Sequence, residues 1–160
     1  MRIGYGYDVH AFSEDRKLIL GGLEVPYIKG LKGHSDADVL LHAITDALLG
    51  SLALGDIGKH FPDTDPDYEG ADSRILLKES YKIVRDRGYE LGNLDATIVA
   101  EKPKLQQYLP EMQNIIAGDL GVPVTAVSLK ATTSERMGFV GRGEGIAVMA
   151  TVLVKEKVNG

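Results

Sequence analysis

The sequence predicts an α/β (α+β) domain: a mixed sheet of four to five strands with helices packed on one face. Two observations predict it. Apolar stretches typical of strands alternate along the chain with segments of helical period. No repeat, linker or low-complexity tract interrupts the 160 residues. That length suits one domain covering residues 1–160.

The expected strands cover residues 2–12, 94–100, 124–132 and 146–155, with a further stretch, Leu18–Pro26, that Gly21-Gly22 breaks at a turn. The last strand is apolar on both faces for much of its length, which predicts burial on both sides, by helices or by a partner subunit. The expected helices cover residues 36–54, 73–87 and 110–121. Residues 56–72 and 138–145 are expected to form a long loop and a glycine-rich turn.

The ends of the helices carry recognisable signals. Ser35 is the expected N-cap of the first helix, with Asp38 at capping-box spacing, and Gly55 is its expected stop. Gly88 is expected to end the second helix. Pro110 is expected to open the third, since proline suits a first turn.

Composition and net charge narrow the range of partners that the protein can have. The formal net charge of −5 disfavours nucleic-acid binding, and the longest apolar run, Ile146–Val154, is too short to span a bilayer. We therefore expect neither nucleic acid nor membrane as a partner. Cysteine is absent, and Met1-Arg2 leads straight into Ile3–Gly6 without a signal peptide. Both features fit a cytoplasmic protein.

Three side chains suit a metal. Asp8 and His10 are two apart on an expected strand and so share one face, and His42 lies in the first helix. Two imidazoles and a carboxylate match a catalytic zinc site with one open position. Each histidine alone would more often be structural. Asp38 and Asp46, four residues either side of His42, extend a polar stripe on an otherwise apolar helix, which favours a site or a narrow wet seam.

Other segments permit two interpretations. His34-Ser35 precedes a helix N-terminus, where an anion would be favoured; the alternative interpretation is simple capping of the helix by Ser35. The aspartates Asp56, Asp63 and Asp65 could bind a hydroxyl-rich substrate, but the sequence alone favours a solvated loop. Ala131–Glu135 follows a strand and suits a phosphate–Mg²⁺ corner or a plain polar turn.

Two more segments give weaker signals. Gly138–Gly145 lacks the spacing of a dinucleotide fingerprint, and its Arg142 could bind a diphosphate or pair with Glu144. Ala100–Leu105 puts two lysines beside a proline at a strand end, where they could surround a nucleotide.

Taken together, five motifs in order and in register resemble the 2-C-methyl-D-erythritol 2,4-cyclodiphosphate synthase family over essentially the whole chain. The motifs are Asp8–Phe12, His34–Asp38 with His42, Gly55–Gly58 with Phe61–Asp65, Ala131–Glu135 and Gly141–Gly145. Two positions depart mildly from the family pattern: Ala37, where glycine is more usual, and Ser134, where threonine is common.

The resemblance implies a lyase of the non-mevalonate isoprenoid pathway. Its substrate would be 4-diphosphocytidyl-2-C-methyl-D-erythritol 2-phosphate, and its products the cyclic diphosphate and CMP. It also implies a homotrimer around a threefold axis, with active sites between subunits and a central cavity able to bind an isoprenoid diphosphate. Zn²⁺ and Mg²⁺ or Mn²⁺ would be the cofactors.

The resemblance also implies residue roles. Zinc would be held by Asp8, His10 and His42, and Mg²⁺ or Mn²⁺ by Glu135, while His34 and Thr133 would stabilise the transition state. Substrate contacts would come from Ser35, Asp46, Asp56, Gly58, Phe61, Asp63, Asp65, Phe139 and Arg142. The cytidine pocket would comprise Ala100, Lys102, Pro103, Lys104, Leu105, Gln106, Ala131 and Thr132.

Two rival functions fit the same metal ligands. One is a zinc phosphohydrolase with an activated water, for which Asp46 or Asp63 could be the base. The other is a non-catalytic isoprenoid- or nucleotide-binding protein with a structural zinc.

Overall fold

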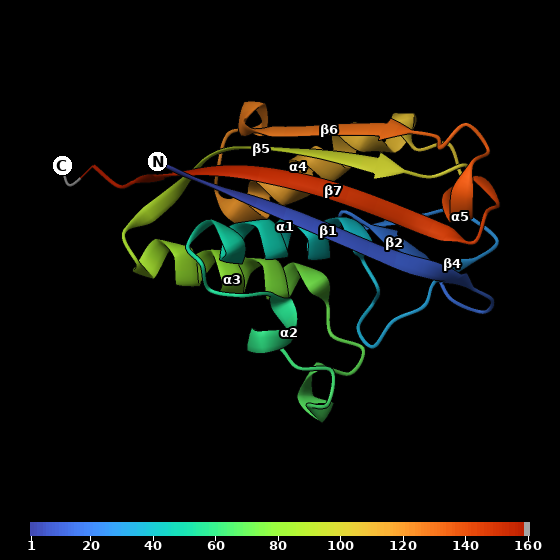
Figure 1. The fold of residues 1–160 in the computed structure, drawn as a ribbon, viewed down its shortest axis with the longest axis horizontal. Helices are drawn as coiled ribbons and strands as arrows, with labels where there is room; N and C mark the ends of the chain where they lie inside the picture. Colours follow the sequence, from blue (N-terminus) through green and yellow to red (C-terminus); the bar gives the residue numbers. More distant parts are fainter. Residues whose placement is uncertain (159–160) are drawn as a thin grey trace.

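Five strands form a mixed sheet in the order β4-β1-β7-β5-β6 in the computed structural model, which describes residues 1–158 (Figure 1). Only β5 and β6 run parallel, and every other neighbouring pair is antiparallel. The predicted mixed sheet is therefore confirmed. Its strands are β1 (Arg2–Ser13), β4 (Gly30–Leu31), β5 (Tyr89–Val99), β6 (Val127–Thr132) and β7 (Gly145–Glu156). A separate hairpin joins β2 (Leu18–Leu20) to β3 (Leu23–Val25), as the glycine pair predicted.

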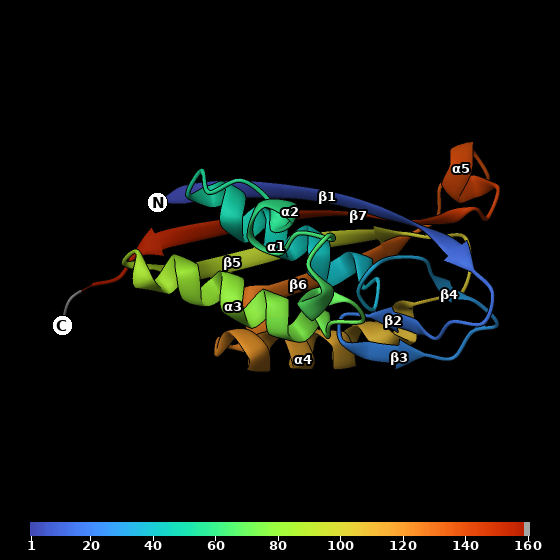
Figure 2. The same cartoon turned by 90° about the horizontal axis from the view of Figure 1, so that it is seen from below.

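The three long helices lie on one face of the sheet, as expected (Figure 2). They are α1 (Val39–Ser51), α3 (Ser73–Asp86) and α4 (Leu109–Leu120). Helix α1 packs on β1 and β7, α4 packs on β6, and α3 packs against α1 and α4. The short helical segments are α2 (Ile57–His60), η1 (Pro66–Tyr68), η2 (Gln106–Tyr108), η3 (Val124–Ala126) and α5 (Gly138–Gly141).

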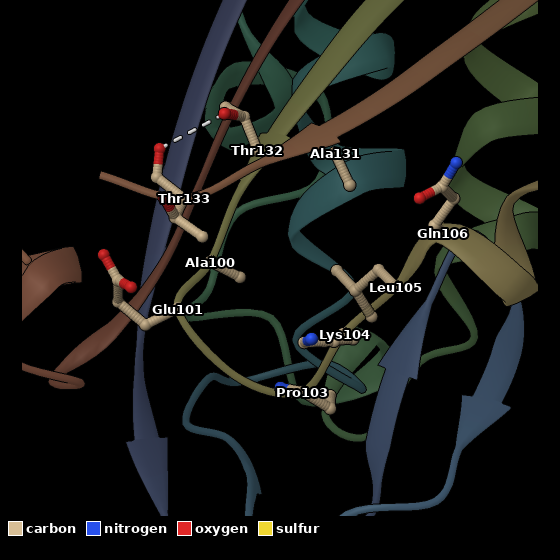
Figure 3. A pocket seen from close by; sticks show the side chains of 9 residues that line it. All are labelled: Ala100, Glu101, Pro103, Lys104, Leu105, Gln106, Ala131, Thr132 and Thr133. Carbon is tan, nitrogen blue, oxygen red and sulfur yellow. Dashed lines mark hydrogen bonds between the residues drawn. The ribbon is translucent and has the colours of Figure 1, made fainter. Parts of the chain in front are cut away.

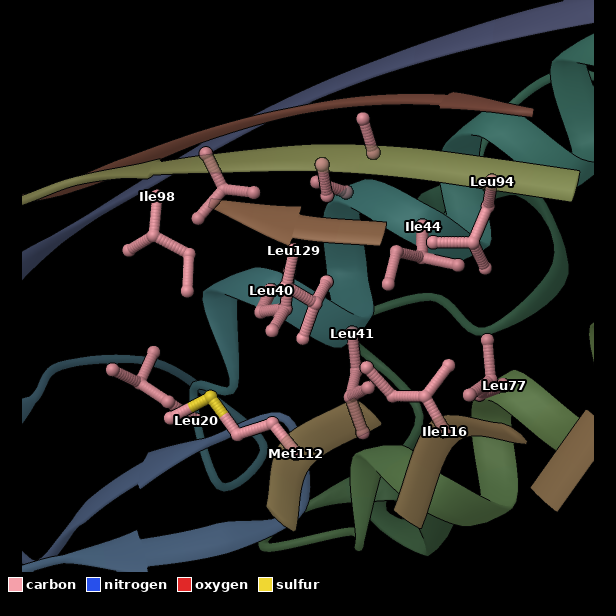
Figure 4. Close-up of a cluster of buried hydrophobic side chains, with 14 of the residues drawn as sticks. Leu20, Leu40, Leu41, Ile44, Leu77, Leu94, Ile98, Met112, Ile116 and Leu129 are labelled. Carbon is pink, nitrogen blue, oxygen red and sulfur yellow. The ribbon is translucent and has the colours of Figure 1, made fainter. Parts of the chain in front are cut away.

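The core fills the space between this helical layer and the sheet (Figure 4). The strands and the three long helices each contribute apolar side chains, and those that meet in this space are almost completely buried. Burial of this apolar surface is the main term that stabilises the layered arrangement. Representative members are Leu40, Leu41, Ile44, Leu77, Leu94, Ile98, Met112 and Ile116.

Within the single chain, strand β7 is fully buried on one face and partly exposed on the other. Val148, Val152 and Val154 point into the core and are fully buried. On the opposite face Met149 and Leu153 are half-buried and Thr151 is exposed. The expectation that both faces are covered thus holds for one face of the single chain.

Helix α1 approaches β1 unusually closely. A Cβ atom added to Gly4 would lie 1.8 Å from the carbonyl oxygen of Ala47, and one added to Gly6 would lie 1.9 Å from that of Ala43. Only glycine leaves room for such an approach of backbone to backbone. The small side chains of the two alanines on the helix complete the contact.

The first helix begins later than expected. Its N-cap is Asp38, not Ser35, and it ends at Ser51, before Gly55. The Asp38 carboxylate accepts N–H bonds from Leu41 (3.0 Å) and from Gly21 (3.0 Å) and Gly22 (2.7 Å) of the β2–β3 turn. Burial raises the pKa of Asp38 to about 6, although these bonds oppose the shift. Asp38 therefore connects the β2–β3 hairpin to helix α1 through hydrogen bonds and does not belong to a solvated polar stripe.

Four other segments differ from the sequence prediction. The segment 56–72 contains α2 and η1 instead of continuous loop, and α5 lies within 138–145. Residues 124–126 form a 3-10 turn, so β6 begins at Val127, whereas β5 begins at Tyr89, five residues earlier than expected. Ala37 has a φ of 58°, a left-handed conformation in which glycine is less strained.

We expect Asp38→Ala to lower the free energy of unfolding by about 2 kcal/mol, because it removes a cap and leaves two turn N–H groups without acceptors. Urea denaturation measures the change. Asp72→Ala, which removes the exposed cap of α3, is the control and should cost about 1 kcal/mol. Equal losses in the two variants would contradict the special role of Asp38.

Candidate metal and nucleotide site

Strand β1 and helix α1 bring the three expected metal ligands together. The Oδ2 atom of Asp8 lies 2.9 Å from Nε2 of His10 and 3.2 Å from Nδ1 of His42. The two ring nitrogens are 3.3 Å apart. All three side chains are mostly buried, with exposed fractions of 25% for Asp8, 18% for His10 and 12% for His42.

A backbone carbonyl determines which nitrogen of His10 faces the site. Its Nδ1 lies 2.7 Å from the carbonyl oxygen of Lys32, which can only accept a hydrogen bond. His10 therefore donates from Nδ1 and presents Nε2 to Asp8. An unprotonated Nε2 and a carboxylate oxygen at 2.9 Å are two acceptors, so the contact needs a cation, either a proton or a metal ion, to hold it together.

The pKa values of Asp8 and His10 reflect this need for a cation. Burial alone would raise the pKa of Asp8, but the hydrogen bonds and charges of His10 and His42 outweigh it and lower the pKa to about 2. Burial likewise opposes protonation of His10, but the bond to Asp8 raises its pKa above 6.5. The three side chains of the triad together therefore favour a cation between them.

The donor set and its geometry fit a divalent metal ion. One ligand atom from each of Asp8, His10 and His42 lies within 4.8 Å of the other two. Three protein ligands of this kind suit zinc with an open fourth position. Within residues 1–158 this is the group of histidine and acidic side chains that offers such a site.

His34 and Ser35 lie beside the triad. Ser35 Oγ is 3.2 Å from Nε2 of His42 and accepts the backbone N–H of Ala37 at 3.2 Å. The Nε2 atom of His34 is buried and has no hydrogen-bond partner among the described residues. Unsatisfied buried nitrogen is uncommon, so His34 keeps hydrogen-bonding capacity for a ligand.

The segment that follows α1 is fastened to it one turn beyond His42. Asp46 Oδ1 accepts the N–H of Ile57 at 2.7 Å, and burial raises the pKa of Asp46. Asp56 caps α2, and Phe61 is buried against Tyr68 in an edge-to-face contact.

The other expected substrate residues of the segment differ in exposure. Gly58 and Asp63 are exposed, and Asp65 caps η1. Asp56 and Asp65 thus stabilise the local fold of the segment as helix caps, whereas Asp63 faces solvent.

A separate cavity of about 300 Å³ lies where β5 and β6 end side by side (Figure 3). It contains every residue expected around cytidine except Lys102, and adds Glu101 and Thr133. Its lining is Ala100, Glu101, Pro103, Lys104, Leu105, Gln106, Ala131, Thr132 and Thr133. None of the three metal ligands lines it.

Glu101 is a residue that the sequence did not single out. Its Oε1 accepts the N–H groups of Ser134 and Arg136, both at 3.0 Å. Glu135 between them is exposed with a φ of 51°, and its N–H donates to Thr133 Oγ1 at 3.2 Å. Glu101 therefore shapes the turn that presents Thr133 and Glu135, which no local sequence signal announces.

The last two expected substrate residues lie on or next to α5, at the end of the sheet where β6 ends and β7 begins (Figure 1). Phe139 is 39% exposed. Arg142 pairs with Glu144, with 2.7 Å between Nε and Oε2. The pair is solvent-exposed, so it contributes little to stability and can open for another anion.

The fold and the triad define an α/β domain of the YgbB family. The family profile matches residues 1–155, and the chain belongs to this family. The chain is 62% identical over 157 residues to the 2-C-methyl-D-erythritol 2,4-cyclodiphosphate synthase of Geobacter metallireducens, covering 98% of this chain and 100% of the relative. The synthase of Cupriavidus metallidurans is 59% identical, covering 96% and 92%.

Similar solved structures support the same family assignment. A 2C-methyl-D-erythritol-2,4-cyclodiphosphate synthase described as the bound form with CDP has a TM-score of 0.89 at 36% identity, covering 96% of this chain and 100% of that one. The bifunctional IspDF from Campylobacter jejuni has a TM-score of 0.94 at 46% identity. The chain covers 42% of its length, with 98% of this chain matched.

The comparisons confirm the resemblance read from the sequence and, with it, the predicted lyase of the non-mevalonate pathway. Among the described residues, no helix combines the length and the apolarity that crossing a membrane requires.

We expect zinc binding by the triad to weaken as pH falls, beginning above the ordinary histidine pKa, because the raised pKa of His10 lets a proton compete for Nε2. The sign follows from the group: His10 is unprotonated and able to ligate only above its raised pKa. Chelator competition between about pH 8 and about pH 6 measures the effect. An affinity independent of pH over that range would contradict it.

Proposed function

We propose that the chain cyclises 4-diphosphocytidyl-2-C-methyl-D-erythritol 2-phosphate. An oxygen of the 2-phosphate attacks the β-phosphorus, and the bond from that phosphorus to the oxygen of the α-phosphate breaks. CMP leaves, and the eight-membered 2,4-cyclodiphosphate closes. The observation that carries the proposal is the Asp8–His10–His42 triad in a chain of the YgbB family.

Two divalent ions would assist this step. Asp8, His10 and His42 would hold Zn²⁺, and Glu135 would hold Mg²⁺ or Mn²⁺ near the α- and β-phosphates. When bound, the ions would act as Lewis acids and offset the charge of two phosphate groups that must meet. The exposure of Glu135 on its turn supports this assignment, since a carboxylate there is free to accept an ion.

The protein's own groups would position the phosphates. Nucleophile and electrophile belong to one molecule, so orientation can supply roughly 7–11 kcal/mol in favourable intramolecular cases. His34 and Ser35 would bind phosphate oxygens, for which the unused Nε2 of His34 is support. The Thr133 hydroxyl would donate to the phosphoryl group as its charge is redistributed. No protein nucleophile is needed.

The methylerythritol part would bind to the segment that follows α1. Its expected contacts are Asp46, Asp56, Gly58, Phe61, Asp63 and Asp65. The support is the bond from Asp46 to Ile57, which keeps this segment one helical turn from His42. Since Phe61 is 7% exposed, it would act by holding the segment in shape.

The cytidine would occupy the 300 Å³ cavity at the ends of β5 and β6. Small side chains such as Ala100, Pro103 and Ala131 leave room in the lining for a flat base. Lys102 and Lys104 would supply positive charge for the phosphates. The CDP bound in a similar solved structure is consistent with this use. The triad would come from a neighbouring subunit, which fits the absence of metal ligands from the cavity lining.

A homotrimer would cover the open face of the sheet. Alternate residues of β1 project from that face, with exposed fractions of 73% for Ile3, 62% for Tyr5, 48% for Tyr7 and 40% for Val9. In the adjacent β7, Met149 and Leu153 pair with Tyr7 and Ile3. A contiguous apolar patch of this kind marks an interface.

Three copies would enclose a cavity on the threefold axis. Phe139 and Arg142 would face it, and an isoprenoid diphosphate could bind there. Arg142 would then pair with the diphosphate in place of Glu144.

We also propose a cytoplasmic setting, which the absence of cysteine from the sequence supports.

The deciding experiment is phosphorus NMR of the protein with substrate and Mg²⁺, with and without a zinc chelator. We expect cyclic-diphosphate signals and CMP, both lost on chelation. A linear product would indicate a zinc phosphohydrolase, and unchanged substrate with bound nucleotide would indicate a non-catalytic binding protein. Either result overturns the proposal.

We expect His42→Ala to lose zinc and to lower turnover by at least about 100-fold, while the circular dichroism spectrum stays native, because His42 supplies one of three ligands. Zinc content and turnover are measured on the same preparation. His60→Ala is the matched control, since His60 hydrogen-bonds only to the carbonyl of Leu54 among the described residues. Full turnover by a zinc-free His42→Ala protein would reject the ligand assignment.

We expect Tyr5→Glu to convert a trimer into monomers, because it places a charge in the apolar face that the subunits would share. Sedimentation measures the mass. Ile75→Glu, at a 51% exposed apolar position on α3, is the control and should stay trimeric. A monomeric wild type would contradict the trimer, and a trimeric Tyr5→Glu would exclude this face as the interface.

A further inference from the structure

The second nitrogen of His42 meets a residue on a helix that supplies no metal ligand. Its Nδ1 faces Asp8 and His10, and its Nε2 lies 2.8 Å from Oγ of Ser73. Ser73 is the first residue of α3 and is completely buried. A fully buried hydroxyl against the far side of a candidate metal ligand calls for a functional explanation.

Asp36 determines the direction of the hydrogen bond. The Ser73 hydroxyl also contacts Oδ1 of Asp36, whose Oδ2 accepts the Ser73 N–H at 3.1 Å. An ionised carboxylate only accepts, so the single hydroxyl proton of Ser73 goes to Asp36. The Ser73 oxygen is then an acceptor toward His42, and His42 must donate from Nε2.

Ser35 is the other hydroxyl within reach of His42 Nε2, but it is farther away, at 3.2 Å. A proton donated by Ser35 to Nε2 would leave the His42 proton on Nδ1, pointing at the ligand atoms of Asp8 and His10. The shorter contact to Ser73 is also supported by a carboxylate charge behind it, which strengthens a hydrogen bond. Asp8 Oδ2 lies 3.2 Å from Nδ1 and could also accept a proton from it, but the contact of Nε2 with Ser73 is shorter, at 2.8 Å. The geometry therefore favours the form of His42 with Nδ1 unprotonated.

We propose that Ser73, oriented by Asp36, is a positioning residue that holds His42 in its Nε2–H form and aims the Nδ1 lone pair at the metal. The inference rests on the zinc site proposed above. It extends the known pairing of metal-binding histidines with carboxylates by inserting a hydroxyl between the two. It also makes the metal centre sensitive to how α3 docks on α1.

We expect Ser73→Ala to weaken zinc binding by roughly 10–100-fold, the usual effect of losing such an outer partner. Chelator competition on the otherwise intact chain gives the dissociation constant. Ser73→Thr keeps the hydroxyl and should restore most of the affinity. Wild-type affinity in a folded Ser73→Ala protein would overturn the proposal.

Ser80→Ala is the matched control. Ser80 lies on the same helix, is completely buried, and its hydroxyl has no partner among the described residues. Its removal should leave zinc affinity unchanged. A loss equal to that of Ser73→Ala would show a general effect of α3 packing and would overturn the specific role of Ser73.

Nitrogen-15 NMR of the imidazoles in the metal-free wild type tests the same inference without any variant or turnover. We expect the Nε2–H form for His42 at alkaline pH, and a mixture of forms in Ser73→Ala. A Nδ1–H form in the wild type would overturn the proposal. A wild type that binds no zinc would instead reject the metal site, whereas equal affinities of wild type and Ser73→Ala would reject only the role of Ser73.

Discussion

The contact of helix α1 with strand β1 is the constraint on which the site depends. Gly4 and Gly6 let the helix backbone approach so closely that no larger side chain would fit. The same face of β1 then carries Asp8 and His10 a few residues further on, where the helix presents His42. A wider spacing would move His42 away from both ligands. The glycines therefore set the distance across which a metal ion can be shared.

Orientation adds a second constraint, because a histidine can present either nitrogen. The carbonyl of Lys32 selects Nε2 of His10, and His42 presents Nδ1. Helix α1 in turn is held in place at its start by Asp38, which joins it to the β2–β3 turn. Loops and caps remote from the reacting atoms thus control the aim of the ligands, as is usual for metal sites.

Much of this could be predicted from local sequence signals. The period of two put Asp8 and His10 on one face, and the Gly21-Gly22 pair located a hairpin. The predicted start of α1 was wrong because Ser35 and Asp38 are equally good N-caps by residue type. Only the tertiary contact with Gly21 and Gly22 selects Asp38. Glu101 and Ser73 were missed because their partners are 33 and 31 residues away. Hydrogen bonds of side chains across such separations have no periodic signature, so no local pattern in the sequence predicts them.

Charge explains why a net-acidic chain suits an anionic substrate only when cations complete it. The −5 chain would repel phosphates at long range, and the ionised Asp8 adds a negative charge at the proposed reaction centre. Two neutral imidazoles, one carboxylate and one divalent ion sum to a local charge of about +1. A second carboxylate among the ligands would cancel that charge. A triad with a single carboxylate would therefore attract the ion and still leave a positive centre for a phosphate oxygen.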